Sequence, residues 1–378
     1  MVFTPVGGAD QYHPSIGTDA TGTIYAVWRD KRNGGAYTDL YFASRPPGGT
    51  WSPALKLNTS TANVTGRPHI VVLENGDLFV IFADARLGTS DVFYMFRPAN
   101  GGWSAEEQVN DVTTGNQFWP ALAVDDQGNA YATWNDLRNG TTVPDLYFSM
   151  RPAGGAWTPS VRVNDVVGKV ASNALPDVAV DSIGNVFVSW TDTRTSSSNT
   201  DVYSDMRPAG GAWGVDQKIN DLGGVANSSP FLAVSSDNTL YAAWDRAADT
   251  RLATRAPGGA WSASEALPGT DNDSGHEIAL DSQDHVYVSH MRQVVTSKWA
   301  PRLSHRLSPG VWETLPLSAY NDSVGSFTEI AFTPTDDTLV AWEDSRADGD
   351  GVTDIDSYLV QVTNSSGDTV LWLSLIHI

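Results

Sequence analysis

Short apolar runs alternate with polar turn residues along almost the whole chain. Runs such as ALAVD, AYATW and DLYFSM (residues 121–125, 130–134 and 145–150) are rich in Val, Tyr, Phe and Trp. Gly, Pro, Asn and Asp interrupt the runs at intervals of roughly ten residues, which is typical of strands joined by turns. No segment has the convincing 3.6-residue apolar period of an amphipathic helix. The pattern therefore predicts many short strands and an all-β fold.

Six tryptophans mark a repeat of this strand pattern, at successive spacings of 52, 54, 56, 48 and 51 residues. An arginine lies six residues before each tryptophan, and a glycine lies two residues before it. Periods of this length are typical of proteins in which each repeat is one supersecondary unit. The chain is therefore predicted to be one array. The tryptophans are Trp51, Trp103, Trp157, Trp213, Trp261 and Trp312.

Each repeat contains four predicted strands. Four-stranded units of this period favour the radial blades of a β-propeller, which exposes only short sheet edges. We predict a single propeller domain over residues 1–372, with seven four-stranded antiparallel blades. Six blades plus a stray unit, or eight blades in the intact gene, are the alternatives. The predicted blades cover residues 12–58, 66–110, 118–164, 174–220, 229–267, 275–317 and 326–372.

The two ends of the chain resemble those of a fragment. The final LSLIHI, residues 373–378, matches the translation of a sequencing-library transposon end, so we interpret it as non-native. Met1 is not followed by the charged and then apolar segments of a signal peptide, and no run approaches the ~20 apolar residues of a membrane span. Any export signal is expected upstream.

The formal net charge of −21 narrows the class of partner. Contacts with nucleic-acid backbone or an anionic membrane need clustered Lys and Arg, so both partners are excluded. A glycan or another small polar ligand, or a protein, fits better. The chain contains no cysteine, so neither disulfides nor thiolate chemistry contributes.

The repeated turn SRPPGGTW, residues 44–51, resembles the Asp-box of sialidase-like (BNR repeat) propellers, although the Asp position holds Pro, Ala or Leu. The resemblance implies an extracellular or cell-surface protein that recognises glycans, with an exo-acting, sialidase-type glycoside hydrolase as its catalytic form. We interpret the turns themselves as scaffold. Tryptophan supplies a large apolar area there, so Trp157→Ala is expected to cost about 3–5 kcal/mol.

Sialidases hold the substrate carboxylate with three arginines and use a tyrosine nucleophile. Residues 66–86, GRPHIVVLENGDLFVIFADAR, resemble the first arginine segment of that family, with Arg67 directly beside Pro68. The other members of the machinery were not identified, so the catalytic residues stay unknown and binding without turnover is favoured. The alternative function is a non-catalytic interaction or structural propeller that presents loops such as residues 193–200.

Two further repeated elements have a structural interpretation. An Asp-x-Arg pair follows the second predicted strand in five units, and its side chains share one face of an extended chain, where they can pair. An asparagine ends the fourth strand in four units. The pairs are Asp30/Arg32, Asp84/Arg86, Asp136/Arg138, Asp192/Arg194 and Asp344/Arg346, and the asparagines are Asn58, Asn110, Asn164 and Asn220.

Functional residues are expected where the repeat is broken, at the channel mouth where the first strands begin. Two positions of the first strand vary between units. They lie three residues and one residue before the apolar residue that recurs in every unit. They bring together an aromatic ring, imidazoles, a guanidinium and carboxylates, which suit sugar binding or acid/base chemistry. The candidates are His13, Arg67, His69, Trp119, Asp177, His276, Glu277 and Glu329.

One loop departs from the repeat by its charge. Residues 345–356, SRADGDGVTDID, place Asp348, Asp350 and Asp354 at a spacing that suits a hard cation. A structural calcium ion and a solvated acidic loop are the two interpretations. No other cofactor is expected.

Overall fold

The computed structural model describes residues 10–34, 37–140, 142–172, 175–247, 249–268, 273–295, 298–318, 327–344, 355–365, 368–370 and 376–377. The protein is a β-propeller of seven four-stranded antiparallel blades, which confirms the predicted fold class and the seven blades predicted for this chain. The described residues form no helix, and so they contain no helix that could cross a membrane.

The strands follow chain order from the centre of the ring outward. Blade 1 contains β1 (Gln11–Thr18), β2 (Ile24–Asp30), β3 (Asp39–Arg45) and β4 (Leu55–Lys56). Blade 2 contains β5 (Val64–Val72), β6 (Leu78–Asp84), β7 (Asp91–Arg97) and β8 (Glu107–Gln108). Blade 3 contains β9 (Gln117–Val124), β10 (Ala130–Asp136), β11 (Asp145–Arg151) and β12 (Val161–Arg162). Blade 4 contains β13 (Asp177–Val180), β14 (Val186–Asp192), β15 (Asp201–Arg207) and β16 (Gln217–Lys218).

The last three blades follow the same order. Blade 5 contains β17 (Asn227–Val234), β18 (Leu240–Arg246), β19 (Asp249–Arg255) and β20 (Glu265–Ala266). Blade 6 contains β21 (Asp273–Leu280), β22 (Val286–Val295), β23 (Lys298–Ser308) and β24 (Val311–Pro316). Blade 7 contains β25 (Thr328–Phe332), β26 (Thr338–Asp344), β27 (Asp356–Ser365) and β28 (Asp368–Val370), and β29 (Ile376–His377) also pairs with β27. β29 lies in the segment that we interpret as non-native, and that interpretation stays a prediction.

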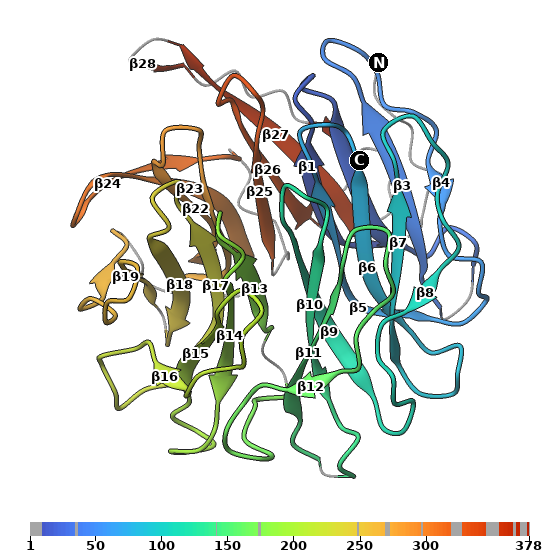
Figure 1. Ribbon diagram of the computed structural model, residues 1–378. Helices are drawn as coiled ribbons and strands as arrows, with labels where there is room; N and C mark the ends of the chain where they lie inside the picture. Colours follow the sequence, from blue (N-terminus) through green and yellow to red (C-terminus); the bar gives the residue numbers. More distant parts are fainter. Residues whose placement is uncertain are drawn as a thin grey trace.

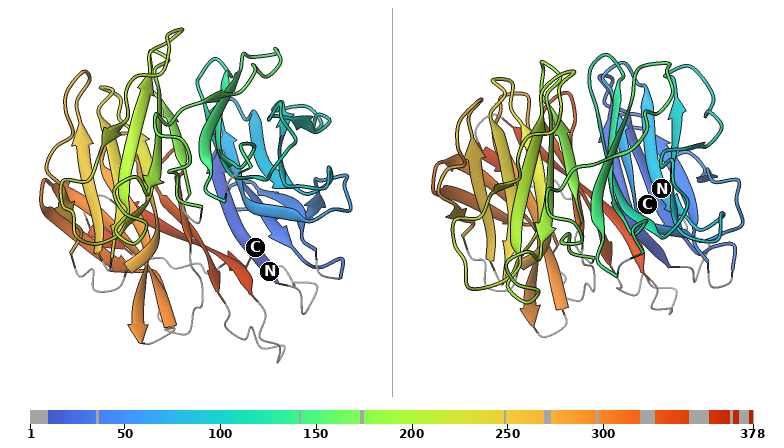
Figure 2. Two further views of the ribbon diagram at one scale, coloured as in Figure 1. Left: turned by 90° about the horizontal axis from the view of Figure 1, so that it is seen from below. Right: turned by 60° about the horizontal axis from the view of Figure 1, so that its bottom comes forward.

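The sheets follow one another around the ring, and the last returns to the first (Figures 1 and 2). β1 contacts β25, β26 and β27, so blade 7 packs against blade 1. The backbone joins there too, because the amide of Gln11 donates to the carbonyl of Ile355 at 2.6 Å. The ring is therefore closed by packing and by hydrogen bonds between its two ends.

Apolar residues fill the spaces between neighbouring sheets. The conserved apolar residue of each first strand is buried in all seven blades, as its alignment in the sequence predicts. One core cluster joins Phe42 of blade 1 to Ile70 and Phe82 of blade 2, for example. These first-strand residues are Ile16, Ile70, Leu122, Val178, Leu232, Ile278 and Ile330.

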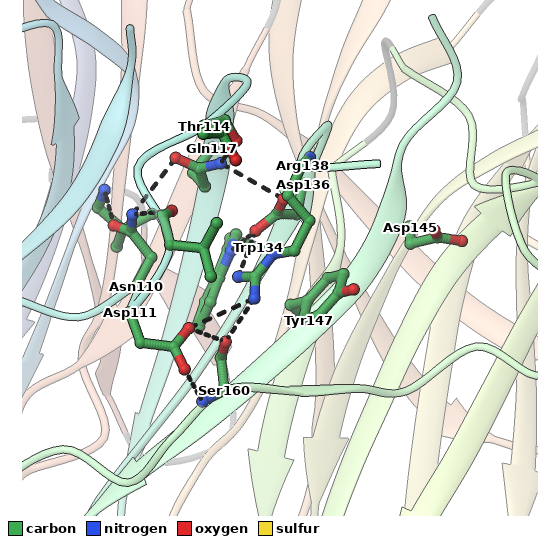
Figure 3. A network of polar contacts seen from close by, with 12 residues as sticks. Asn110, Asp111, Thr114, Gln117, Trp134, Asp136, Arg138, Asp145, Tyr147 and Ser160 are labelled. Carbon is green, nitrogen blue, oxygen red and sulfur yellow. Dashed lines mark hydrogen bonds and ion pairs between the residues drawn. The ribbon is translucent and has the colours of Figure 1, made fainter. Parts of the chain in front are cut away.

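In blade 3 a buried aspartate at the end of the second strand binds a tryptophan of that strand and an arginine of the loop that follows it (Figure 3). In blade 3 the indole of Trp134 donates to Asp136 at 2.9 Å, and the guanidinium of Arg138 binds the same carboxylate at 2.7 Å. Arg138 also reaches Asp111, which follows the last strand of blade 2, at 3.3 Å. The predicted pairing within Asp-x-Arg is thus confirmed in blade 3, and it extends to the neighbouring blade. Arg346, of the predicted pair in blade 7, lies outside the described residues.

The same arrangement recurs around the ring. Indole-to-aspartate bonds of 2.9 and 3.0 Å form in blades 1 and 4, and arginine-to-aspartate pairs form in blades 1, 2 and 4. The tryptophans of the second strands are fully buried, and the sequence analysis missed them as a set. They are Trp28, Trp134, Trp190, Trp244 and Trp342.

The asparagine two residues beyond the fourth strand ties this end of the strand to the third strand. In blade 2, Asn110 accepts a hydrogen bond from the backbone of Val92 at 2.8 Å and donates to Asp91 at 2.7 Å. Asn58, Asn164 and Asn220 make the equivalent bonds in blades 1, 3 and 4. Their structural interpretation is therefore confirmed.

The repeated turn fastens each blade to the one before it. Trp157 packs edge-on against Tyr94 of blade 2 with ring centroids 5.2 Å apart, and Trp213 packs against Phe148 of blade 3 at 5.0 Å. All six turn tryptophans are only partly buried. The expected cost of 3–5 kcal/mol for Trp157→Ala is therefore too large, because that range applies to fully buried side chains.

We expect the two sets of tryptophans to differ in their effect on stability. Trp134→Ala removes a fully buried indole and its hydrogen bond to Asp136, and should lower the free energy of unfolding by about 3–5 kcal/mol. Trp157→Ala should lower it by about 1–2 kcal/mol, because its ring is partly exposed. Urea unfolding followed by circular dichroism measures both, and a larger loss in Trp157→Ala would contradict this order.

Candidate functional site

A β-bulge interrupts the first strand where it reaches the channel mouth. In blade 1 the pairing jumps from Tyr12 to Ser15, so two residues lie opposite one residue of β2. Equivalent bulges occur in blades 3, 5 and 6. The first bulge residue has a left-handed backbone, which non-glycine residues rarely adopt. Left-handed bulge residues are His13 (φ 51°), Gly66 (70°), Trp119 (53°), Ser229 (52°) and Gly275 (63°).

Blade 2 holds one extra residue in its bulge. The pairing there jumps from Thr65 to His69, so three residues lie opposite one. Gly66 takes the left-handed position that His13 takes in blade 1, and Arg67 is the addition. The sequence alignment, which placed Arg67 in register with His13, is therefore wrong by one residue. Bulges re-aim side chains, and this one directs Arg67 to the channel mouth.

Arg67 lies against two glutamates from blades 6 and 7. Its Nη2 is 3.0 Å from Oε2 of Glu277 in blade 6 and makes a shorter contact with Oε1 of Glu329 in blade 7. Its guanidinium also lies 5.4 Å from the ring of Phe231 and 5.8 Å from that of Phe327. Burial alone would lower the pKa of Arg67, but the two carboxylates raise it, so the guanidinium stays charged.

The carboxyl groups around Arg67 hold their protons unusually tightly. Burial, with the negative charge of Glu329 added, raises the pKa of Glu277 well above its ordinary value. Burial also raises the pKa of Glu329, against the opposing effect of Arg67. Burial raises the pKa of Asp177 to about 6, although backbone amides and Arg67 act in the opposite direction. The site thus combines a fixed cation with carboxyl groups whose pKa values lie above the ordinary range.

The first-strand position directly before the recurring apolar residue makes two different kinds of contact. In blades 1, 2 and 4 its side chain accepts a hydrogen bond from the backbone of the next blade. Glu277 and Glu329 occupy the same position in blades 6 and 7 but bind Arg67. The accepting side chains are Ser15 (from Ile70, 3.1 Å), His69 (from Leu122, 3.3 Å) and Asp177 (from Leu232, 2.7 Å).

His69 is neutral at physiological pH. Burial, followed by the charge of Arg67, lowers its pKa to about 3. Its Nδ1 accepts the amide hydrogen of Leu122, which leaves Nε2 as the protonated nitrogen. His69 can therefore donate a hydrogen bond to a ligand, but it does not act as a cation.

Three aromatic side chains from different blades meet beside this charged cluster. The ring of His13 packs edge-on against Phe327 at 5.2 Å and against Trp119 at 6.2 Å. His13 is held by Glu343 of blade 7, whose carboxylate accepts its backbone amide and lies 3.1 Å from its Nδ1. Burial would raise the pKa of Glu343, but these bonds and the charge of Arg29 lower it.

His276 is buried one residue before Glu277. Its Nδ1 lies 2.9 Å from Oδ1 of Asp245, and its ring packs edge-on against Phe231 at 5.4 Å. Burial alone would lower the pKa of His276, but Asp245 raises it. His276 thus contacts the wall of the site through Phe231.

The structure brings five of the eight candidates into one pocket at the channel mouth. This pocket encloses about 340 Å³, counting the solvent space inside it. His13, Trp119 and His276 lie outside the lining and contact its surroundings through ring packing. We call it the channel-mouth pocket; its lining residues are Arg67, His69, Pro120, Ala121, Leu175, Pro176, Asp177, Phe231, Glu277 and Glu329.

The metal prediction is not tested. Asp348, Asp350 and Asp354 lie outside the described residues. Among the residues that the structure does describe, no group of three or more His, Asp or Glu side chains could hold a metal ion.

Sequence reasoning missed the residues that fix the bulges. Each follows the buried second-strand tryptophan and contacts the bulge of the next blade. Arg29 donates to the carbonyl of Gly66 at 3.0 Å, and Thr191 accepts the amide of Ser229 at 2.9 Å. Asp245 and Glu343 hold His276 and His13 in the same way. The sequence did carry a signal for them: the residue after the second-strand tryptophan is polar and differs from unit to unit, within an otherwise apolar strand.

No protein family model and no curated protein sequence matches the chain. Solved structures do. A polysaccharide lyase described as an ulvan lyase aligns with a TM-score of 0.65 and 13% identity, over 93% of this chain and 94% of its own. The α-L-arabinofuranosidase of Fusarium graminearum with arabinobiose aligns at 0.54 and 14%, over 77% and 91%. The α-L-arabinanase of Penicillium chrysogenum aligns at 0.53 and 13%, over 75% and 89%. These neighbours include glycoside hydrolases and a polysaccharide lyase, and at such identities they establish a shared propeller fold.

The raised pKa of Asp177 predicts a pH dependence of stability. Folding lifts this pKa from 3.8 to about 6, so the native state binds the proton more tightly and loses stability as pH rises between these values. Asp177→Asn keeps an oxygen that can accept the backbone amide of Leu232. It should abolish the pH-dependent loss in the free energy of unfolding, which we expect to be about 1–3 kcal/mol. Urea unfolding at pH 4, 5, 6 and 7 measures it. The control is Asp126→Asn on an exposed turn. An unchanged pH slope in Asp177→Asn would refute the assignment.

Proposed function

We propose that this protein binds a glycan in the channel-mouth pocket and hydrolyses a glycosidic bond there. The observation that carries the proposal is the placement of Arg67, an extra residue in one bulge, against two glutamates of blades 6 and 7. Blades 1, 3, 5 and 6 form their bulges without this residue. A charged cluster that the scaffold does not require is a candidate functional site.

The surroundings of the cluster suit a sugar. Phe231 and Leu175 give the pocket an apolar wall, while its carboxyl groups and His69 offer polar partners. A sugar ring has an apolar face that packs on aromatic side chains and hydroxyl groups that need hydrogen bonds. Trp119 lies beside the pocket and adds a further aromatic surface. The glycan-acting enzymes among the structural neighbours support the proposal through the fold that they share with this chain.

Two carboxyl groups with different environments can divide the chemistry. Glu277 is the more exposed, at 18% against 9% for the side chain of Glu329, and burial raises its pKa well above the ordinary value. In our proposal Glu277 donates its proton to the glycosidic oxygen as the bond from C1 to that oxygen breaks. Glu329 contacts the same Nη2 of Arg67 as Glu277, so the two carboxyl groups lie about 5 Å apart, the separation of retaining enzymes, and Glu329 in its ionised form attacks C1. Water then attacks C1 of the glycosyl-enzyme, Glu277 takes up the proton of this water, and the bond from C1 to Glu329 breaks. The products are two sugars with free hydroxyl groups.

A sialidase type of this activity is the less favoured form. It would need three arginines around the substrate carboxylate and a tyrosine nucleophile. The described lining of the channel-mouth pocket contains one arginine, Arg67, and no tyrosine. We therefore propose the two-carboxylate mechanism.

Glycan-array screening, followed by reducing-sugar release from each bound glycan, tests the proposal. The parent should bind and cleave at least one glycan. Glu277→Gln should keep binding but lose about 100-fold or more in turnover, because it cannot act as the acid. Trp119→Ala should weaken binding about tenfold. Arg162→Ala, an exposed arginine of β12, is the control and should behave like the parent.

Arg67→Ala is a harsher variant, because it leaves two buried glutamates without their counter-ion. The triple variant Arg67→Met, Glu277→Gln and Glu329→Gln removes the whole cluster and should fold, yet lose binding. If this folded variant and Trp119→Ala both bind glycans like the parent, the proposed site is wrong.

A further inference from the structure

We infer that the channel-mouth pocket selects a neutral terminal sugar and rejects acidic sugars such as uronates and sialic acids. The inference rests on the proposed function and adds its substrate class. It reverses the expectation that a lone arginine at the mouth of such a channel would hold a sugar carboxylate.

The first argument is that Arg67 already has two anionic partners. Its Nη2 contacts both Glu277 and Glu329, and its guanidinium is buried between Phe231 and Phe327. A ligand carboxylate could bind Arg67 only by displacing a glutamate. That glutamate would then be buried without its counter-ion, which is strongly unfavourable. A sugar hydroxyl needs no such exchange.

The second argument is the balance of charge. The titratable groups that line the pocket are one guanidinium, one imidazole and three carboxyl groups: Arg67, His69, Asp177, Glu277 and Glu329. His69 is neutral, so Arg67 is the cation of the described lining. A ligand carboxylate would add a fourth acidic group to this buried cluster. The chain as a whole carries −21, which also repels an acidic polysaccharide on approach.

The third argument concerns hydrogen bonding and size. Carboxylate oxygens accept hydrogen bonds from hydroxyl groups, and the protonated form of Glu277 can also donate one. Phe231 and Leu175 supply an apolar wall for the carbon face of a ring. The lining comes from six blades around the axis and leaves only a small space, so at most the end of a glycan enters it.

Matched pairs of ligands that differ only in the acidic group test the inference. Titration calorimetry at pH 7 would compare methyl glucoside, galactoside and mannoside with the corresponding methyl uronides, and a methyl sialoside would be added. The parent should bind at least one neutral glycoside about 100-fold more tightly than its uronide. Trp119→Ala should weaken that binding, which places the sugar at the channel mouth.

A change of specificity provides the sharper test. Glu329→Gln removes the negative charge that contacts Arg67 most closely, with little change of shape, so it frees Arg67 for an outside carboxylate. It should narrow the preference for the neutral glycoside about tenfold, mainly through tighter uronide binding. Asp205→Asn is the matched control, because Asp205 is a buried carboxyl group of β15 whose pKa burial also raises to about 6, but it lies outside the pocket lining. It should leave the preference unchanged.

The outcomes separate the two proposals. Tighter binding of a uronide or sialoside that depends on Trp119 would overturn the neutral-sugar inference and leave the proposed glycan site standing. An unchanged preference in Glu329→Gln would also overturn it. If neither neutral nor acidic glycosides bind, and the glycan array is negative as well, the proposed function fails and the inference fails with it.

Discussion

A buried carboxylate at the end of the second strand holds each of blades 1 to 4 together from inside. In blade 3, Asp136 accepts the indole of Trp134 and pairs with Arg138, which continues to the neighbouring blade. A buried charge is tolerated only when it is paired and hydrogen-bonded, so this contact fixes the strand end, the loop that follows it and the blade interface together. Because these loops surround the channel mouth, the precision of the candidate site depends on a set of contacts that lie behind it.

The scaffold and the site use equivalent positions for different purposes. Asp177 joins blade 4 to the backbone of blade 5, whereas Glu277 and Glu329, at the same position of their blades, turn to Arg67. A propeller needs only some of its first-strand contacts to hold neighbouring blades in register. The remaining positions can carry buried charge, provided that the charges neutralise one another. This explains why acidic residues gather where a purely structural ring would place hydroxyls or small apolar side chains.

The fold could be predicted from local information, and the site only in part. Regular spacing of Trp51 and its five equivalents was enough for a propeller, because each blade is built from residues close together in sequence. The spacing could not show how deeply those rings are buried, and so the turn tryptophans were given too large a role. The first-strand positions at which the repeat is broken indicated the channel mouth as the candidate site. The contact of Arg67 with Glu277 joins residues 210 positions apart and depends on one extra residue in a bulge, which no local pattern reveals.

The bulge of blade 2 also bears on how such a site could arise. An extra residue in a regular strand would turn every later side chain to the opposite face of the sheet. Here the alternation is preserved, because Ile70 pairs with Val80 just as Ile16 pairs with Ala26 in blade 1. The irregular segment takes up the change in length, and the core on either side is undisturbed. A single codon inserted at such a point could therefore place a new charged group at the channel mouth, which makes the five first-strand bulges natural points for the divergence of activity on one framework.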